Sequence, residues 1–444
     1  MLYLSNNYIF SSFKSWEKKR ERTIFKSLED VINYQNKKIS FIKKHHENNG
    51  LENFEYTNKV PNLNVDYKEF FKMTRSGTTS LNSDRSYFYS LNQKILDAHH
   101  FWKIERLNNI EKPGNVVWIA ATDYGQADQS GFILGSPSKN RIKLIDQKYY
   151  NVGFENKVYE LLYDYRFSKD HWRYNLEIIK NMDVKFLRTS PSVIQTLYYY
   201  FKDEYFFDFP VVLSEETLHD EVRTMAEFMF SKVIDKCVAW DGCLGWFECC
   251  CGTKHIYDEF CRIKQLDHNV LAVTDLNNFA CPFFNYINGD KGVVGTIDCD
   301  CGLSGYYFKS FEGKIVESIY IDENKFLPGR YVYEKLSKLF KGDYSSSNDF
   351  ALLENSITNF EETFPADFVF KILQKENLQI DFTYFCKGDL SSSQIEFIRN
   401  YLNIILWRNS NCKKINFIKE FEIFKKNNRR DKVLMVRSDY LSRF

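Results

Sequence analysis

A short stretch rich in hydroxyl side chains has a composition suited to binding phosphate. In Thr74–Ser80, which reads TRSGTTS, every residue except Arg75 carries a hydroxyl group or is glycine. Backbone N–H groups and hydroxyls donate to phosphate oxygens, and a glycine lets a phosphate approach the chain closely. The stretch predicts a phosphate-binding loop, with a Ser/Thr-rich surface turn as the alternative. The residues at its centre are Ser76, Gly77, Thr78 and Thr79.

The cysteines gather in one part of the chain. The sequence has 11, and all lie between Cys237 and Cys301 except Cys386 and Cys412. An odd number of cysteines without a secretion signal argues against a disulfide framework. The clustering indicates a metal site or reactive thiols, although some of these cysteines must serve as small buried hydrophobic residues.

The overall composition excludes several broad classes of protein. The chain has 444 residues, of which 44% are hydrophobic, enough for a large domain and a smaller one. Its 60 basic and 59 acidic residues leave a net charge of +1, so neither nucleic acid nor an anionic membrane is the default partner. We find no signal-peptide pattern and no run of about 18 apolar residues, and therefore expect a cytoplasmic protein without a membrane partner.

Strands and helices are expected to alternate through the first half of the chain, as in an α/β sheet with helices on its faces. Strands are expected at 116–121, 184–187, 211–214 and 233–240, and helices at 87–107, from 193 onward and at 215–230. The helix at 87–107 carries His99 and His100. Adjacent residues point to different sides of a helix, so we assign these histidines packing or surface roles and no joint metal site.

The residue pattern of the second half of the chain changes twice. Residues 271–311 are rich in strand and turn signals, and from about residue 314 a charged mixture of strands and a helix follows. We therefore expect a large N-terminal domain at 1–312 and a small C-terminal domain at 313–444. In the small domain, strands are expected at 368–374 and 380–386 and a helix at 392–406.

A second segment, further along the chain, supports the interpretation of Thr74–Ser80 as a phosphate-binding loop. Pro282–Asp290, which reads PFFNYINGD, resembles the Pro-Leu-x-Arg-Tyr-x-x-Gly-Asp segment of adenylate-forming enzymes, and Thr74–Ser80 resembles their phosphate loop. On these segments, in this order, the chain resembles the adenylate-forming (acyl-adenylate) enzyme superfamily, specifically its phenylacetate–coenzyme A ligase-like branch. The resemblance implies an α/β fold with a large adenylation domain and a small, mobile α+β C-terminal domain.

Two shorter segments are similar to the same branch. Residues 187–192 are similar to its Gly-Tyr-Pro-Ser turn, which introduces a helix near the acyl pocket, and residues 212–216 are similar to its Ser-Gly-Glu strand end. Alone, both patterns are also ordinary helix starts.

The resemblance implies a site for ATP and Mg²⁺. The central residues of the Ser/Thr/Gly loop, already named, would bind the phosphates, and Asp290 would accept hydrogen bonds from both ribose hydroxyls. The family's Tyr-Gly-x-Ser/Thr-Glu segment is replaced here by Ala239–Gly245, AWDGCLG. There Trp240 would stack on adenine and Asp241 would supply the carboxylate for Mg²⁺.

The cysteine-rich segment also resembles this branch, through its Glu-Cys…His and Cys-x-Cys-Gly elements. The resemblance implies a closed structural zinc site, which takes four N or S ligands. Its ligands would be Cys249, His255, Cys299 and Cys301. Cys251 is the alternative to Cys249, and adjacent buried thiols without a metal are the alternative to the site. Zinc would pin the segment 249–301, which has little core of its own.

Two lysines complete what the resemblance implies. The hinge between the domains corresponds to 313–317, with Lys314 as the hinge residue. Lys432 corresponds to the catalytic lysine that binds the carboxylate and the α-phosphate during adenylation, with Lys426 as the alternative.

The implied activity is a carboxylate ligase reaction in two steps. ATP activates a carboxylic acid as an acyl adenylate, and the acyl group then passes to an acceptor such as coenzyme A, an amine or a carrier protein. Two alternatives remain at this point. The protein transfers the adenylyl group itself to a hydroxyl or amine, or it is a non-catalytic member that binds a nucleotide or a partner.

Overall fold

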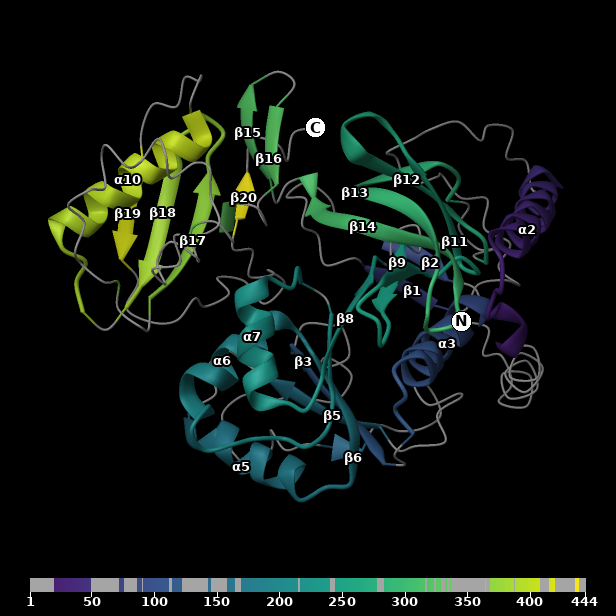
Figure 1. The fold of residues 1–444 in the computed structure, drawn as a ribbon, viewed down its shortest axis with the longest axis horizontal. Helices are drawn as coiled ribbons and strands as arrows, with labels where there is room; N and C mark the ends of the chain where they lie inside the picture. The colour runs from purple at the N-terminus through teal and green to yellow at the C-terminus, as the bar shows by residue number, and fades with distance from the viewer. Residues whose placement is uncertain are drawn as a thin grey trace.

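The computed structural model describes residues 20–48, 72–75, 86–89, 91–111, 114–121, 143–144, 158–163, 169–214, 216–239, 244–277, 283–315, 318–322, 325–328, 332–333, 336, 364, 368–386, 388–407, 415–419 and 436–438. Within these residues the protein has a large and a small sheet flanked by helices (Figure 1). The predicted α/β fold class is confirmed.

The large sheet has twelve described strands in the order β11-β12-β13-β14-β10-β9-β8-β7-β6-β3-β5-β4. Its first half is parallel except for the edge strand β4, and comprises β3 (Asn115–Ala121), β4 (Lys143–Leu144), β5 (Val158–Tyr163), β6 (Val184–Thr189), β7 (Val211–Leu213) and β8 (Val233–Val238). Its second half is antiparallel and comprises β9 (Gly245–Glu248), β10 (Lys254–Ile256), β11 (Cys261–Gln265), β12 (Val270–Asp275), β13 (Tyr286–Asp298) and β14 (Ser304–Lys314). The 3₁₀ turn η3 (Asp267–Asn269) joins β11 to β12.

Helices cover both faces of the parallel half, which is why its strands are short apolar runs. One face packs against α5 (Lys169–Lys180), α6 (Pro191–Phe201) and α7 (Asp220–Met229) (Figure 1). The other face packs against α3 (Leu91–Leu107), whose Phe101 and Ile104 share a buried cluster with Val116 and Val212.

The N-terminal residues pack on the antiparallel half. The 3₁₀ turn η1 (Arg20–Thr23) precedes α2 (Leu28–Asn48). The Gln35 amide of α2 donates to the carbonyl oxygens of Asp258 and Cys261, at 3.0 and 3.2 Å. The strands β1 (Lys72–Arg75) and β2 (Ser86–Tyr89) form an antiparallel pair ahead of α3.

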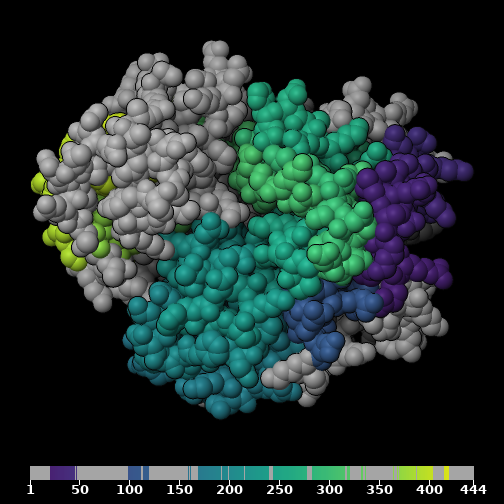
Figure 2. Space-filling model, viewed as in Figure 1, coloured from purple at the N-terminus to yellow at the C-terminus, as the bar shows by residue number. Residues whose placement is uncertain are grey.

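The C-terminal residues have a core of their own. The hairpin of β15 (Ser318–Asp322) and β16 (Lys325–Pro328) leads to a sheet in the order β19-β18-β17-β20. Its strands are β17 (Val369–Gln374), β18 (Ile380–Phe385), β19 (Ile415–Lys419) and β20 (Val436–Ser438), and α10 (Ser392–Trp407) lies against it. The buried cluster here begins at Ile319, whereas the clusters of the large sheet end at Phe311. On the face shown in Figure 2, the purple residues of α2 lie against the green residues of the large sheet, and the yellow residues of the C-terminal part lie on the opposite side of the molecule.

Most of the expected strands are present, and two expected helices were wrong at their N-terminal ends. Residues 86–89 form β2, and the helix begins only at Leu91, because the aromatic run Tyr87–Tyr89 favours a strand. The helix expected at 215–230 begins at Asp220, after His219 in extended backbone conformation. None of the helices in the described part of the chain is long and apolar enough to cross a membrane.

Candidate functional site

Two tight turns lie side by side at one end of the antiparallel half. One joins β13 to β14 and carries Cys299 and Cys301; the other joins β9 to β10 and carries Cys249. Each turn contains a glycine in the left-handed region, Gly302 at φ +87° and Gly252 at φ +76°, which only glycine adopts without strain. Pairing of β10 with β14 places the two turns next to each other.

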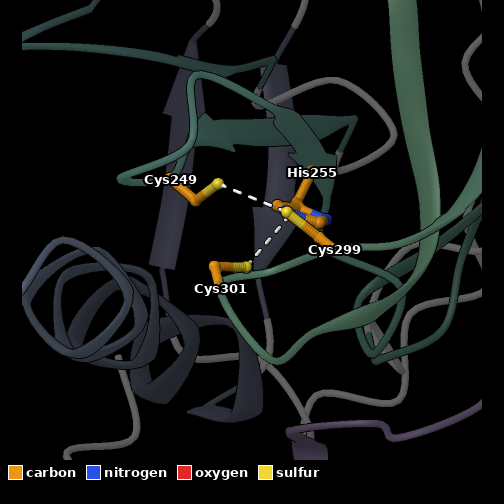
Figure 3. Close-up of side chains that lie close together, drawn as sticks. All are labelled: Cys249, His255, Cys299 and Cys301. Carbon is orange, nitrogen blue, oxygen red and sulfur yellow. Dashed lines mark hydrogen bonds between the residues drawn. The ribbon is translucent and has the colours of Figure 1, made fainter.

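The four predicted metal ligands come together at these turns. The ligand atoms of Cys249, His255, Cys299 and Cys301 all lie within 4.8 Å of one another (Figure 3). The sulfur atoms of Cys249 and Cys299 are 3.8 Å apart, and Cys301 Sγ lies 3.3 Å from His255 Nε2. Sulfurs of a tetrahedral zinc site, with Zn–S about 2.3 Å, are separated by about 3.8 Å. The donor set, and the separation of Cys249 and Cys299, therefore fit a tetrahedral zinc site.

The thiols of this group share their protons unequally. A hydrogen bond from the Cys301 thiol, aided by His255 and opposed by burial, lowers the pKa of Cys249 to about 3. The same hydrogen bond, with burial, raises the pKa of Cys301 well above its usual value. The cluster thus favours a thiolate at Cys249, which is the form that binds a metal cation.

Two members of this group are buried, whereas Cys299 and Cys301 are partly exposed. Cys249 is 3% exposed and His255 is fully buried, whereas Cys250 and Cys251 are exposed and lie outside the group. The backbone N–H of Cys251 donates to Cys249 Sγ at 3.4 Å. The geometry thus favours Cys249 over Cys251 as the fourth ligand, and a group with four protein ligands suits a structural role.

At the opposite end of the β13–β14 hairpin lies the predicted ribose-binding carboxylate, Asp290. Its partner across the hairpin is Lys314, whose Nζ is 3.3 Å from Asp290 Oδ1 and donates to the Asn288 carbonyl at 3.0 Å. The Asn288 side-chain amide donates to Asp290 Oδ2, and the Asp290 N–H donates to Asn288 Oδ1 at 3.0 Å. Gly289 between them has φ +82°.

This arrangement joins two residues predicted for different tasks. Asp290 was expected to bind ribose and Lys314 to act as the hinge, yet their side chains form one ion pair, in which Asp290 is buried and Lys314 is partly buried. Lys314 is the last residue of β14, so it belongs to the sheet of the N-terminal part. Asn288, which the sequence interpretation did not single out, orients the carboxylate; its position two residues before Asp290 was the available signal.

The remaining predicted site residues lie outside the described residues. β1 ends at Arg75, so Thr74 and Arg75 of the predicted phosphate-binding stretch belong to a strand, and β8 ends at Val238, two residues before Trp240. The undescribed predictions are Ser76, Gly77, Thr78, Thr79, Trp240, Asp241 and Lys432.

A buried charge network near the large sheet was missed by the sequence interpretation. Glu259 accepts from Lys103 Nζ at 2.8 Å and lies 2.8 Å from His99 Nε2. Burial would raise the pKa of Glu259, but Lys103 and His99 together lower it to about 2. Lys103 follows His99 by four residues on α3, which puts both on one helix face and was the signal available. His100 is also buried and lies against the Tyr257 ring. Of the expected packing or surface roles, His100 therefore has a packing role, and His99 is buried in the charge network.

Solved structures share this architecture over nearly the whole chain. A 2-hydroxyisobutyryl-CoA ligase in the postadenylation state, in complex with R3-HIB-AMP, matches with a TM-score of 0.57 and 10% identity over 93% of this chain and 89% of the ligase. Its complex with 2-HIB-AMP matches with a TM-score of 0.56 and 10% identity over 94% and 90%. No protein-family model and no curated protein sequence matches the chain. At this identity, the likeness establishes the fold.

Proposed function

Because the chain has the fold of the adenylate-forming ligases, as the sequence resemblance predicted, we propose that it is an ATP-dependent carboxylate ligase. It activates a carboxylic acid as an acyl adenylate and passes the acyl group to a thiol or an amine. The observation that carries this proposal is the fold shared over 93% of the chain with a CoA ligase bound to an acyl adenylate.

The proposed first step joins two anions. A carboxylate oxygen of the acid attacks the α-phosphorus of ATP, the bond to the bridging oxygen breaks, and pyrophosphate leaves. Since both reactants are negative, catalysis depends on positioning and on neutralisation of charge. Lys432 would supply a fixed positive charge, and Asp241 would hold Mg²⁺ against the phosphates.

The proposed second step transfers the acyl group. The sulfur or nitrogen of the acceptor attacks the acyl carbonyl, loses its proton, and displaces AMP. Coenzyme A, an amine and a carrier-protein thiol all present such a nucleophile.

ATP would contact the protein at three places. Trp240 would stack on the adenine, and the loop formed by Ser76, Gly77, Thr78 and Thr79 would hold the phosphates. Asp290 would accept hydrogen bonds from the ribose hydroxyls, and its bonds to Asn288 and Lys314 support this role because they fix both carboxylate oxygens. A carboxylate has about four acceptor positions, so it can keep these bonds and accept from ribose as well.

We place the boundary between the two domains at 312–313, with the hinge at 313–317, so that the hinge begins in the last two residues of β14, Gly313 and Lys314. The change of buried core between Phe311 and Ile319 supports this boundary. Lys314 would couple the hinge to the nucleotide, since its ammonium contacts the carboxylate that is proposed to bind ribose.

We further propose that Cys249, His255, Cys299 and Cys301 hold a structural zinc ion. A bound zinc ion would neutralise the thiolates and cross-link the two turns. The four side chains hold their metal-binding atoms within 4.8 Å of one another. The backbone N–H group of Cys251 donates to Cys249 Sγ and so stabilises the Cys249 thiolate. Such a site requires reduced thiols, which suits the cytoplasm, and its donor set supports membership of the phenylacetate–coenzyme A ligase-like branch.

The test is exchange of labelled pyrophosphate into ATP across a panel of carboxylic acids. We expect exchange that requires the acid and Mg²⁺, and AMP released into solution once an acceptor is added. The same sample should contain about one zinc per chain. Absence of exchange with every acid, or AMP retained covalently on the acceptor, would contradict the ligase assignment.

A further inference from the structure

Two exposed cysteines stand next to the proposed zinc ligands in the sequence. In the triplet Cys249–Cys251, the first thiol belongs to the four-ligand group, which is Cys249, His255, Cys299 and Cys301. Cys250 and Cys251 lie outside this group and are exposed. The clustered cysteines indicated a metal site or reactive thiols, and the four-ligand group leaves this pair of thiols unused.

The turn between β9 and β10 brings the two exposed thiols together. Adjacent side chains diverge on a strand and on a helix, so the thiols of two neighbouring residues meet only where the chain turns. The Sγ atoms of Cys250 and Cys251 lie 3.8 Å apart, the same separation as that of Cys249 and Cys299. Two sulfurs that share a tetrahedral ion, with metal–sulfur bonds of about 2.3 Å, are separated by about this distance. The pair therefore has the spacing of two ligands of one ion.

Backbone hydrogen bonds hold this turn in place. The Cys250 N–H donates to the carbonyl oxygen of Leu107, the last residue of α3, at 3.0 Å. The Cys251 N–H donates to Cys249 Sγ at 3.4 Å, and the Gly252 N–H donates to the Cys249 carbonyl oxygen at 2.9 Å. A metal that binds to a preorganised turn does not have to order the backbone, so this entropic cost does not reduce its affinity.

The exposure of the pair decides what kind of metal site it can make. Thiolates select soft cations such as Zn²⁺, and the still softer Cd²⁺, over Mg²⁺ and Ca²⁺. Two thiolates leave two positions of a tetrahedral ion open, and at the surface water or a ligand of a metal donor can fill them. An ion held in this way exchanges with solution, whereas four protein ligands leave no position open.

We infer that Cys250 and Cys251 form a second, exchangeable metal site for a soft divalent cation of the Zn²⁺ and Cd²⁺ class. As the two metal–sulfur bonds form, each thiol releases its proton to solvent. The site depends neither on the ligase reaction nor on the four-ligand group, because it uses different thiols. Since its ion exchanges, dialysis removes that ion and leaves the metal of the four-ligand group in place.

Titration with Cd²⁺ tests the second site. The full-length protein is dialysed, its zinc content is determined, and Cd²⁺ is added while sulfur-to-metal charge-transfer absorption and zinc release are measured. We expect about one equivalent of Cd²⁺ per chain to bind without release of zinc. Mass spectrometry after treatment with iodoacetamide should show that Cd²⁺ protects Cys250 and Cys251 from alkylation, and that dialysis restores their reactivity.

Serine variants identify the ligands. Cys250→Ser and Cys251→Ser should each weaken Cd²⁺ binding about 100-fold or more, because the second thiol of the pair binds as an intramolecular ligand. Both variants should keep the zinc content and the thermal midpoint of the wild type, since the two residues are exposed and lie outside the four-ligand group. The matched control is Cys237→Ser, a partly exposed cysteine of β8, which should leave Cd²⁺ binding unchanged.

The outcomes separate the second site from the proposed zinc ion. Release of one zinc for each Cd²⁺ bound would place the cadmium in the four-ligand group and overturn the second site. Equal binding by the wild type and by the double variant Cys250→Ser/Cys251→Ser would overturn it as well. A protein that contains no zinc would contradict the structural zinc ion, and protection of Cys250 and Cys251 by Cd²⁺ in Cys301→Ser would still support the pair.

Discussion

The two ends of the β13–β14 hairpin both gather polar side chains, but they balance charge in different ways. At the turn, Cys299 and Cys301 meet Cys249 and His255 from a second hairpin. At the open end, Asp290 meets Lys314 from the facing strand. The open end contains its own positive charge, whereas the turn gathers three thiols and an imidazole, and the pKa of one of these thiols, that of Cys249, is lowered.

This difference predicts how each end responds to change. A charged group that is paired within the protein is destabilised when its partner is removed. The remaining charge is then buried without a counter-charge. Thiols grouped around a metal ion are stabilised only while the metal is bound. The stability of such a group therefore depends on the metal concentration. The predictions below run from the largest expected effect to the smallest.

Loss of a thiol at the turn should have the largest effect. Cys301→Ser removes one of the four donors, so we expect loss of the bound zinc and a fall in the thermal midpoint of at least about 5 °C, measured by metal analysis and calorimetry. The matched control is Cys250→Ser, an exposed neighbour outside the group, which should retain metal and stability. Equal stability of the two variants would show that the turn needs no cation.

The ion pair between Lys103 and Glu259 is a third case for this comparison, because it belongs to a fully buried network. Lys103→Met leaves Glu259 without its main counter-charge, and we expect a loss of about 3 kcal/mol in the free energy of unfolding at pH 7. The control is Arg106→Met, on the same helix as Lys103. It breaks an exposed pair with Glu21 of η1 and should cost about 1 kcal/mol or less.

The same pair has a defined pH dependence. In the wild type the pKa of Glu259 is lowered to about 2, so its stabilising contribution is present above the ordinary value of about 4.5 and is lost as the pH falls toward 2. Without Lys103, burial raises this pKa. The gap in stability between wild type and Lys103→Met should therefore narrow from pH 7 to pH 3, as measured by denaturant unfolding. A gap independent of pH would show that the charge of Glu259 is not the cause.

At the open end of the hairpin, Asp290→Asn tests nucleotide binding. The amide keeps the shape but presents one acceptor oxygen, so we expect the KM for ATP to rise about 10-fold or more, with a smaller effect on thermal stability. The control Asp267→Asn changes an exposed aspartate of η3 and should leave the KM unchanged. An unchanged KM in Asp290→Asn would restrict Asp290 to its structural pairing with Lys314.

The smallest effect is expected where the C-terminal part touches the large sheet's helices. The Tyr333 hydroxyl donates to Glu221 Oε2 at 3.3 Å, and its ring lies 4.4 Å from the His219 ring. Tyr333→Phe should weaken this contact by about 1 kcal/mol, measured in a double-mutant cycle with Glu221→Gln. Tyr384→Phe, in the same C-terminal core, is the control. Additive effects of the two substitutions would show that the hydroxyl carries no coupling.

Local patterns in the sequence were sufficient for the strands and for the types of residue at each site. Short apolar runs such as Val116–Ala121 are strands because both faces of the parallel sheet are covered. Competing local signals explain the misplaced start of α3, where the aromatic residues 87–89 pair with β1 instead of extending the helix. The Cys-x-Cys and Gly-Asp patterns predicted candidate thiol and carboxylate sites because their chemistry depends on residue type.

Only the tertiary structure decided which of these residues meet. The register of β10 with β14 places Cys249 beside His255, Cys299 and Cys301 and leaves Cys251 outside this group, although Cys249 and Cys251 are separated by a single residue. The register of β13 with β14 pairs Asp290 with Lys314, and that of β3 with β6 sets Arg188 beside Trp118. Such contacts follow from strand pairing between distant segments, which the periodicity of any one segment does not contain.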